Sequence, residues 1–152
     1  LESLIAAAHL GPSVRYMQPW RFLHIRAAAL RESIYAMVEA ERLRTADALN
    51  ERREEFLRLK VEGIRECGDV LVACLREGRE RYVLGRRTMP EMDLASVACA
   101  IQNMWLAARA EGIGLGWVSL FEPRALATLL KMPEDARPIA ILCVGRVASF
   151  HS

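Results

Sequence analysis

The segment from Asp93 to Glu111 constrains the fold of this chain more than any other stretch. Apolar residues recur in it at the i, i+3, i+4 and i+7 spacing of an α-helix. Small residues, mainly alanine, fill many of the positions between them, so the helix is apolar or small nearly all round. Such a helix is buried on more than one side, and we expect it at the centre of the domain, with one side at a subunit boundary. The apolar positions are Leu94, Val97, Ala98, Ile101, Met104, Trp105 and Ala108.

The other periodic segments predict an α+β domain with helices around a mixed sheet. A capping box over Thr88–Glu91 is expected to open the central helix, and Gly112 to end it. The charges between 28 and 67 indicate a solvated helix face, with a partner-binding helix pair as the alternative. The further predicted elements are helices at 1–10, 28–67 (broken near 48–51) and 123–130, strands at 21–25, 69–75, 115–121 and 138–147, and a basic loop at 76–87.

The composition limits the classes of function. A length of 152 residues indicates one domain. A net charge of +2 is too near balance for a nucleic-acid groove or a polybasic membrane anchor, and no apolar run reaches the roughly 18 residues that span a bilayer. The four cysteines lack metal-ligand spacing, which indicates buried free thiols and a cytoplasmic protein. We therefore expect no metal, nucleic-acid or membrane partner.

Residues 13–20 form a proline-stiffened loop that runs directly into the strand predicted at 21–25. On it, Ser13 and Gln18 supply a hydroxyl and an amide, and Pro19 and Trp20 supply apolar surface. Pockets for small ligands combine a few polar groups with apolar walls, so these four residues are candidate ligand contacts. A structural role fits the same residues equally well: Trp20 would then fill the core and Gln18 would cap a helix end.

Glycines lead into a later strand, with Ser119 just beyond them. A dinucleotide-binding fingerprint follows a strand and opens a helix, whereas these glycines follow a helix and open a strand, which excludes that motif. The missing side chains at Gly114 and Gly116 allow another backbone or a planar ligand to come close. Ser119 can donate or accept a hydrogen bond. Together with the loop at 13–20, this segment indicates a flat, polar-edged cofactor.

Two stretches, GPSVRYMQPWRF and RTMPEMDLASVACAIQNMWLAARAEGIGLGWVSLF, resemble the nitroreductase-like flavoproteins that make 5,6-dimethylbenzimidazole, the lower ligand of cobalamin. The similarity extends over essentially the whole chain. It implies a nitroreductase-like fold and an obligate homodimer with FMN sites at the subunit interface. It also implies an oxidoreductase in which reduced FMN reacts with O₂ and is fragmented to 5,6-dimethylbenzimidazole and erythrose 4-phosphate. FMN is then consumed as a substrate, and O₂ is the co-substrate.

The resemblance implies roles for single residues as well. Ser119 matches a serine near the flavin that is tied to catalysis, and Thr88–Asp93 matches a segment that covers the pocket. The loop and the later glycines match positions around the flavin ring. The cofactor-binding residues implied in this way are Ser13, Gln18, Pro19, Trp20, Gly114 and Gly116.

The chain also departs from the family pattern. Arg15 stands where glycine is expected in many relatives. The family's N-terminal motif of arginines and an aspartate, and a downstream phosphate-binding arginine, have no match. We therefore expect a single domain over residues 1–152 that lacks N- and C-terminal segments. The alternative functions are an NAD(P)H-dependent FMN nitroreductase or quinone reductase, and a flavin-binding or interaction module without chemistry.

Overall fold

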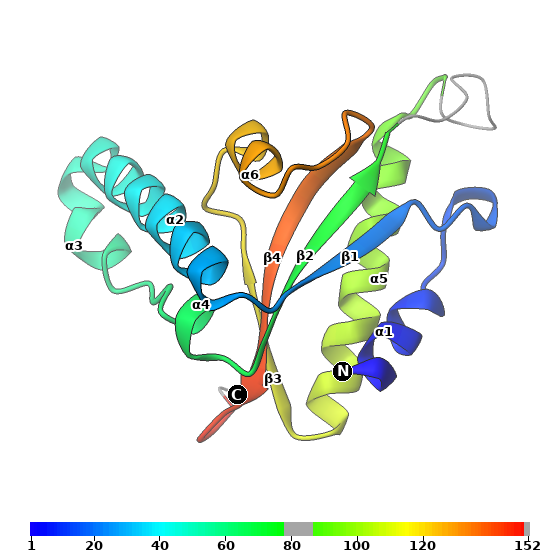
Figure 1. Ribbon diagram of the computed structural model, residues 1–152, viewed down its shortest axis with the longest axis horizontal. Helices are drawn as coiled ribbons and strands as arrows, with labels where there is room; N and C mark the ends of the chain where they lie inside the picture. The colour runs from blue at the N-terminus through cyan, green and yellow to red at the C-terminus, as the bar shows by residue number, and fades with distance from the viewer. Residues whose placement is uncertain (78–86, 151–152) are drawn as a thin grey trace.

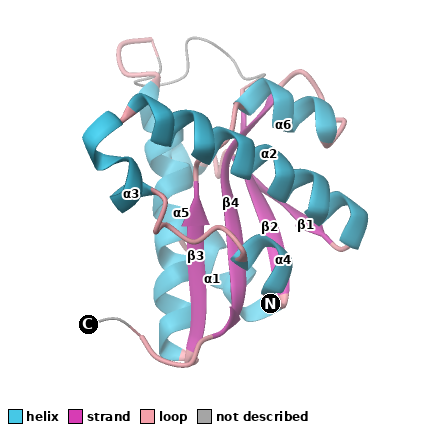
Figure 2. Ribbon diagram, turned by 90° about the vertical axis from the view of Figure 1, so that its left-hand side faces the viewer, coloured by secondary structure: helices cyan, strands magenta, loops and turns pink. Residues whose placement is uncertain are grey.

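The computed structural model describes residues 1–77 and 87–150, so most of the predicted basic loop at 76–87 lies outside the described residues. A four-stranded sheet forms the middle of the molecule, and helices cover both of its faces (Figures 1 and 2). The expected α+β class is therefore confirmed. None of the helices in the described part of the chain is long and apolar enough to cross a membrane.

The strand order in the sheet is β1-β2-β4-β3, and every neighbouring pair is antiparallel. A mixed sheet has both parallel and antiparallel pairs, so the expectation of a mixed sheet is wrong for the described strands. The helical segments between β1 and β2 lead away from the sheet and back to it. Ile25 at the end of β1 therefore pairs with Val70 near the start of β2. β2 pairs on both sides, as predicted for a central strand, and β1 and β3 are the two edges. The strands are β1 (Trp20–Ile25), β2 (Asp69–Arg76), β3 (Ile113–Val118) and β4 (Ala136–Arg146).

Two hydrophobic clusters lie on the two faces of the sheet. Alternate residues of a strand point to opposite faces, so Leu71 packs in one cluster and Val72 in the other. The first cluster contains residues of α1 (Glu2–His9) and α5 (Glu91–Ala110). The second contains residues of α2, α4 and α6. These last helices span Ala28–Ala48, Gly63–Glu66 and Pro123–Leu129.

The long helix α5 has the predicted central position but not the predicted burial all round. Val97, Ile101, Met104 and Ala108 are fully buried. Leu94 and Trp105, which were expected in the core, are each 37% exposed, and Leu106 is 52% exposed. One apolar side of α5 therefore remains uncovered in the single chain.

The predicted capping box before α5 is wrong. The helix begins at Glu91, its N-cap is Pro90, and no side chain caps it. Thr88 consequently lies outside the capping position. Backbone bonds start the helix instead, because the N–H groups of Met92 and Asp93 donate to the carbonyl oxygens of Met89 and Pro90.

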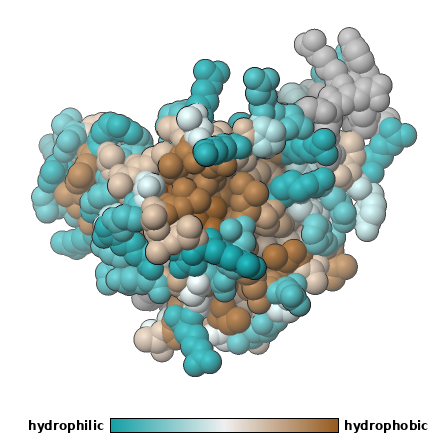
Figure 3. All heavy atoms as spheres, in the orientation of Figure 1, coloured by the Kyte–Doolittle hydropathy of each residue, from teal (hydrophilic) through white to brown (hydrophobic). Residues whose placement is uncertain are grey.

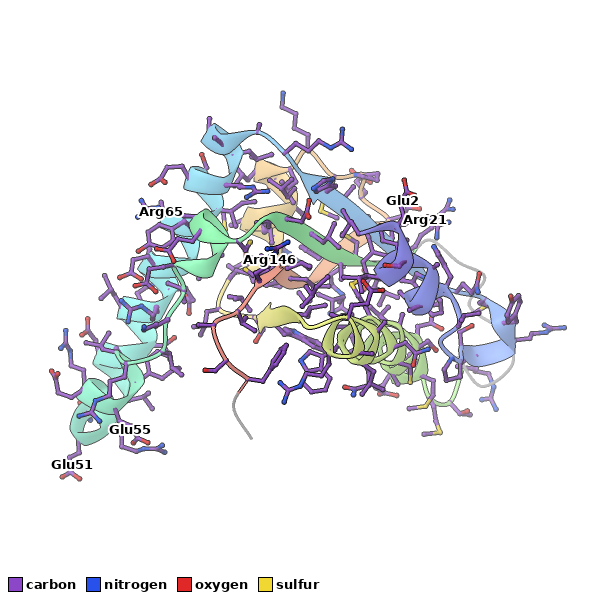
Figure 4. All side chains as sticks on the ribbon, turned by 90° about the horizontal axis from the view of Figure 1, so that it is seen from below. Glu2, Arg21, Glu51, Glu55, Arg65 and Arg146 are labelled. Carbon is purple, nitrogen blue, oxygen red and sulfur yellow. The ribbon has the colours of Figure 1, made fainter. Side chains whose placement is uncertain are left out.

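The single helix predicted after the break near residue 48 does not form. The chain makes a short 3₁₀ turn, then α3 (Arg53–Phe56), an irregular stretch and α4. Leu59 is 52% exposed whereas Ile64 is fully buried, so the two residues do not lie on one packed helix face. Arg42 on α2 donates to the carbonyl oxygens of Leu57 and Leu59, at 2.7 and 3.4 Å, which stabilises a non-helical path there. Figure 4 shows Glu51 and Glu55 at the tip of this helical arm, residues 28–66.

Candidate functional site

The predicted ligand loop, residues 13–19, folds back onto the end of α1. The backbone N–H of Gln18 donates to Oγ of Ser13 at 3.1 Å. The side-chain amide of Gln18 donates to the carbonyl oxygen of His9 at 2.9 Å. These bonds give the loop a defined shape and use part of the hydrogen-bonding capacity of both predicted ligand contacts.

Arg15 has a left-handed backbone conformation in this loop. Its φ is 51° and its ψ is 30°, and Tyr16 follows with a φ of 54°. This left-handed region is free of steric penalty for glycine but costs other residues about 1–2 kcal/mol. The glycine expected here in relatives therefore has a physical reason. Backbone strain of this kind concentrates at functional sites, which favours a functional role for the loop.

The loop is anchored to α5 through a serine that sequence reasoning treated only as a small residue. The N–H of Val14 donates to Oγ of Ser96 at 3.2 Å, and Ser96 donates to the carbonyl oxygen of Met92 at 2.7 Å. Ser96 is 4% exposed. No signal in the sequence pointed to this contact, because it joins two segments that are far apart in the chain.

Trp20 is fully buried, and its neighbour Pro19 is buried as well. The Trp20 ring packs in the cluster between the sheet, α1 and α5. Its indole N–H donates to Nδ1 of His9 at 3.0 Å. The structure thus places Trp20 in the core-filling role that the sequence analysis gave as one of two alternatives. Its part in a ligand site stays a prediction.

Ser119 lies directly after the last residue of β3 and is exposed. The N–H of Phe121 donates to the carbonyl oxygen of Ser119 at 3.1 Å, which turns the chain. The carboxylate of Glu122 then accepts from the N–H of Ala125 at 2.6 Å and caps α6. Ser119 therefore sits on a tight turn between two elements that hold it in place.

The ligand loop and Ser119 lie at opposite edges of the sheet, and the sheet register aligns Val118 with Leu23 and not with Trp20. Trp20 begins the edge strand β1 and pairs with Leu75, whereas Val118 ends the other edge strand, β3, and pairs with Ile141. Three interstrand spacings separate the two edges, roughly 14 Å. A single chain therefore does not enclose one ring between Ser119 and its own loop.

Gly114 and Gly116 line a cavity of about 760 Å³ beside the edge strand β3. A methyl group built on Gly114 would overlap Cγ1 of Val147, so close packing already occupies that space. A methyl group on Gly116 would meet only Cys143, at 3.8 Å or more. Figure 4 shows Arg146 at the end of β4, between α4 and β3. Other residues of the cavity wall are Gly63, Cys67, Trp105, Arg109 and Cys143.

The sequence matches the nitroreductase family over residues 1–146. The chain belongs to the nitroreductase family. The family resemblance and the fold expected from the sequence are therefore confirmed. The ligand loop and Ser119, by contrast, lie at opposite edges of the sheet in this nitroreductase chain.

Two relatives within the nitroreductase family match nearly the whole chain. The 5,6-dimethylbenzimidazole synthase of Rhodospirillum rubrum is 39% identical over 144 residues, which cover 93% of this chain and 68% of that protein. The protein of the same name from Rhodobacter capsulatus is 37% identical over 147 residues, covering 95% of this chain and 71% of that protein. The chain thus groups with the synthases of this name within the nitroreductase family.

A solved structure supports the nitroreductase fold independently. Oxidized iodotyrosine deiodinase, bound to FMN and 3-iodo-L-tyrosine, superposes with a TM-score of 0.81 at 21% identity. The match covers 99% of this chain and 79% of the deiodinase chain. At this identity the likeness concerns the fold alone.

The segment predicted to cover the pocket of this nitroreductase, Thr88–Asp93, forms the turn into α5. Met89 is 52% exposed and Met92 36% exposed, whereas Asp93 is 3% exposed. The carbonyl oxygen of Met92 accepts the bond from Ser96 that anchors the ligand loop. The segment therefore lies next to the loop, as a pocket cover would require.

Proposed function

We propose that this protein is a 5,6-dimethylbenzimidazole synthase that takes reduced FMN as substrate and dioxygen as co-substrate. The flavin is fragmented to 5,6-dimethylbenzimidazole and erythrose 4-phosphate, which supplies the lower ligand of cobalamin. The similarity to synthases of this name over nearly the whole chain carries the proposal. When bound, the reduced flavin supplies a ring that reacts with dioxygen.

The polar groups of the loop and of Ser119 fit such a ligand. Ser119 offers an exposed hydroxyl at the end of β3. The loop offers the hydroxyl of Ser13, the amide of Gln18 and the exposed guanidinium of Arg15. The ring of FMN has a hydrogen-bonding edge, and its phosphate is a good acceptor for a guanidinium. The donor set therefore matches both ends of the ligand.

We place each flavin between two copies of the chain. Because the loop and Ser119 lie at opposite edges of one sheet, a twofold assembly can set the loop of one copy against Ser119 of the other. Exposed apolar side chains support a partner, since Leu106 is 52% exposed and Trp117, on the edge strand β3, is 47% exposed. Figure 3 shows a further apolar area on the face between α2 and α6.

Each candidate residue has a role in this proposal. Ser119 is the catalytic residue, and its Oγ holds a proton at the ligand. Ser13 and Gln18 bind the ring edge, and the buried Pro19 and Trp20 hold their loop in place. Gly114 and Gly116 have no side chains, so the flavin can come close to one side of β3. Enclosure between two copies excludes water, which strengthens each polar contact.

A cytoplasmic location and a single domain belong to the same proposal. All four cysteines are free, which fits a reducing compartment. The two hydrophobic clusters share one sheet, which supports one domain.

The direct test mixes the full natural protein with reduced FMN, admits air and measures 5,6-dimethylbenzimidazole by mass spectrometry. We expect product from the wild type, and a loss of roughly 100-fold or more in Ser119→Ala, with FMN affinity changed only a few fold. Ser33→Ala is the matched control, because it removes a hydroxyl that bonds only within α2, and it should keep the wild-type yield.

The outcomes test the catalytic role of Ser119 separately from the synthase activity itself. A wild-type yield in Ser119→Ala would remove the catalytic role of this serine. No product from the wild type would overturn the synthase. Rapid bleaching of bound FMN by NADPH without oxygen, again without product, would identify an NAD(P)H-dependent nitroreductase instead.

A further inference from the structure

Cys67 and Cys143 lie side by side in the cavity beside β3. Cys67 follows α4, and Cys143 lies on β4. Both residues line the cavity, and each thiol is the largest cause of the pKa shift of the other. The expectation that all four cysteines are buried is wrong for this pair and for Cys99, because these three are only partly buried. The register of β2 on β4 brings the two together, which the sequence spacing does not reveal.

Glycines keep the two sulfur atoms open to the cavity. A methyl group on Gly63 would lie 3.8 Å from Sγ of Cys143, and one on Gly145 would lie 3.5 Å from Cβ of Cys67. Gly116, across from Cys143 in the sheet, likewise has no side chain to cover it. The cavity of about 760 Å³ is large enough for a small reagent to reach the pair.

A fixed positive charge lies next to Cys67. The guanidinium of Arg31 donates to the carbonyl oxygens of Cys67 and Gly68, each at 2.9 Å, and to that of Ile25 at 3.0 Å. These three bonds hold the guanidinium in one position. A cation near a thiol favours the thiolate, which is the nucleophilic form.

The interaction between the two thiols shifts their pKa values in opposite directions. The neighbouring thiol of Cys143, together with Arg31 and the N–H of Val144, lowers the pKa of Cys67 to about 7. Partial burial and the carboxylate of Asp69 act against this, as does the carbonyl oxygen of Asp69, which accepts from the protonated thiol at 3.1 Å. The neighbouring Cys67 and burial raise the pKa of Cys143. Near neutral pH, Cys67 is therefore the nucleophile and Cys143 the proton-bearing partner.

We propose that Cys67 and Cys143 form a redox-active pair that reacts with hydroperoxides. The thiolate of Cys67 attacks one peroxide oxygen, so that an S–O bond forms, the O–O bond breaks and hydroxide or alkoxide leaves. The sulfur is oxidised to a sulfenic acid and the peroxide is reduced. The thiol of Cys143 then loses its proton and attacks that sulfur, which forms the S–S bond and releases the sulfenic oxygen as water. This inference is independent of the proposed function.

The chain contains its own reference thiols. Cys74 is buried in the second cluster, and burial raises its pKa to about 12. Cys99 lies on α5, away from the cavity wall, and is partly buried. We expect both to remain reduced when the pair is oxidised.

The test treats the protein, without added FMN, with one equivalent of hydrogen peroxide at pH 7, followed by alkylation and peptide mass analysis. We expect a disulfide between Cys67 and Cys143 and a chain lighter by two hydrogen atoms. Cys143→Ser should stop at a sulfenic acid on Cys67 that a 1,3-dione traps, Cys67→Ser should give no dione adduct, and Cys99→Ser should still cross-link. A wild-type chain in which Cys67 remains alkylatable, or reacts no faster than Cys99, overturns the proposal.

A second measurement does not depend on any variant. The pH profile of Cys67 alkylation should have its midpoint near pH 7 in the folded protein. The same cysteine in the urea-unfolded chain should have its midpoint near the ordinary value of about 8.5. Equal midpoints in the two states would contradict the thiolate assignment.

Discussion

The indole N–H of Trp20 donates a hydrogen bond to Nδ1 of His9 at 3.0 Å. This bond joins the first residue of β1 to the last residue of α1. Trp20 has no exposed surface, whereas His9 is exposed. The pair therefore closes the base of the ligand loop and connects it to the core.

Removal of the Trp20 side chain should destabilise the protein far more than loss of this hydrogen bond. Trp20→Ala empties a fully buried site, so we expect a loss of about 3–5 kcal/mol in the free energy of unfolding. His9→Ala removes only the acceptor, and a loss of about 1–2 kcal/mol is expected. Urea unfolding of both variants measures the difference. Equal losses would show that the bond, and not the packing of the ring, dominates.

Gly114 and Gly116 should respond differently to the same substitution. Gly114→Ala places a methyl group against Val147, and crowding of this kind costs about 1–3 kcal/mol. Gly116→Ala meets only Cys143, at 3.8 Å or more, so a change within about 0.5 kcal/mol is expected. Thermal unfolding compares them, and Val147→Ala should restore the stability of Gly114→Ala. A failure of that rescue would place the crowding elsewhere.

Elements with a strong local pattern could be predicted from the sequence. The apolar run at 69–75 is the central strand β2, and Pro123 opens α6 as expected. The helix at 93–111 is α5 to within two residues at its start. In these segments, local preference and tertiary packing favour the same structure.

Features that depend on distant contacts could not be predicted. The path of the chain after α3 depends on bonds from Arg42 to carbonyl oxygens 15 and 17 residues further along. The strand order places Ser119 and the loop at opposite edges, and no local pattern carries strand order. The thiol pair and the bond from Val14 to Ser96 likewise require the folded arrangement. The positions of the candidate site residues in space therefore depend on contacts that the sequence alone does not reveal.

Arg42 should hold the helical arm together, unlike the other arginines along it. Its guanidinium bonds to both carboxylate oxygens of Glu39, at 2.7 and 2.8 Å, and this contact lowers the pKa of Glu39. It also bonds to the carbonyl oxygen of Leu57, and its side chain is 13% exposed. Arg42→Ala should cost about 1.5–3 kcal/mol and accelerate amide exchange around Leu57.

The matched control for Arg42 is another arginine of the same arm. Arg52 pairs with Glu55, but its side chain is 73% exposed. Exposed pairs contribute little, so Arg52→Ala should change the free energy of unfolding by no more than about 0.5 kcal/mol. Similar amide exchange in the two variants would show that Arg42 is not what fixes the arm.

A charge on the exposed side of α5 should abolish the proposed homodimer. Leu106 on α5 and Leu59 on the helical arm are each 52% exposed, so Leu106→Glu and Leu59→Glu are matched. If α5 lies in the interface, a buried unpaired glutamate there weakens association by about 2 kcal/mol or more, roughly 30-fold. Sedimentation should show Leu106→Glu as a monomer with weakened FMN binding, and Leu59→Glu as a dimer with wild-type binding. A dimeric Leu106→Glu variant that still binds FMN normally would exclude this side of α5 from the interface.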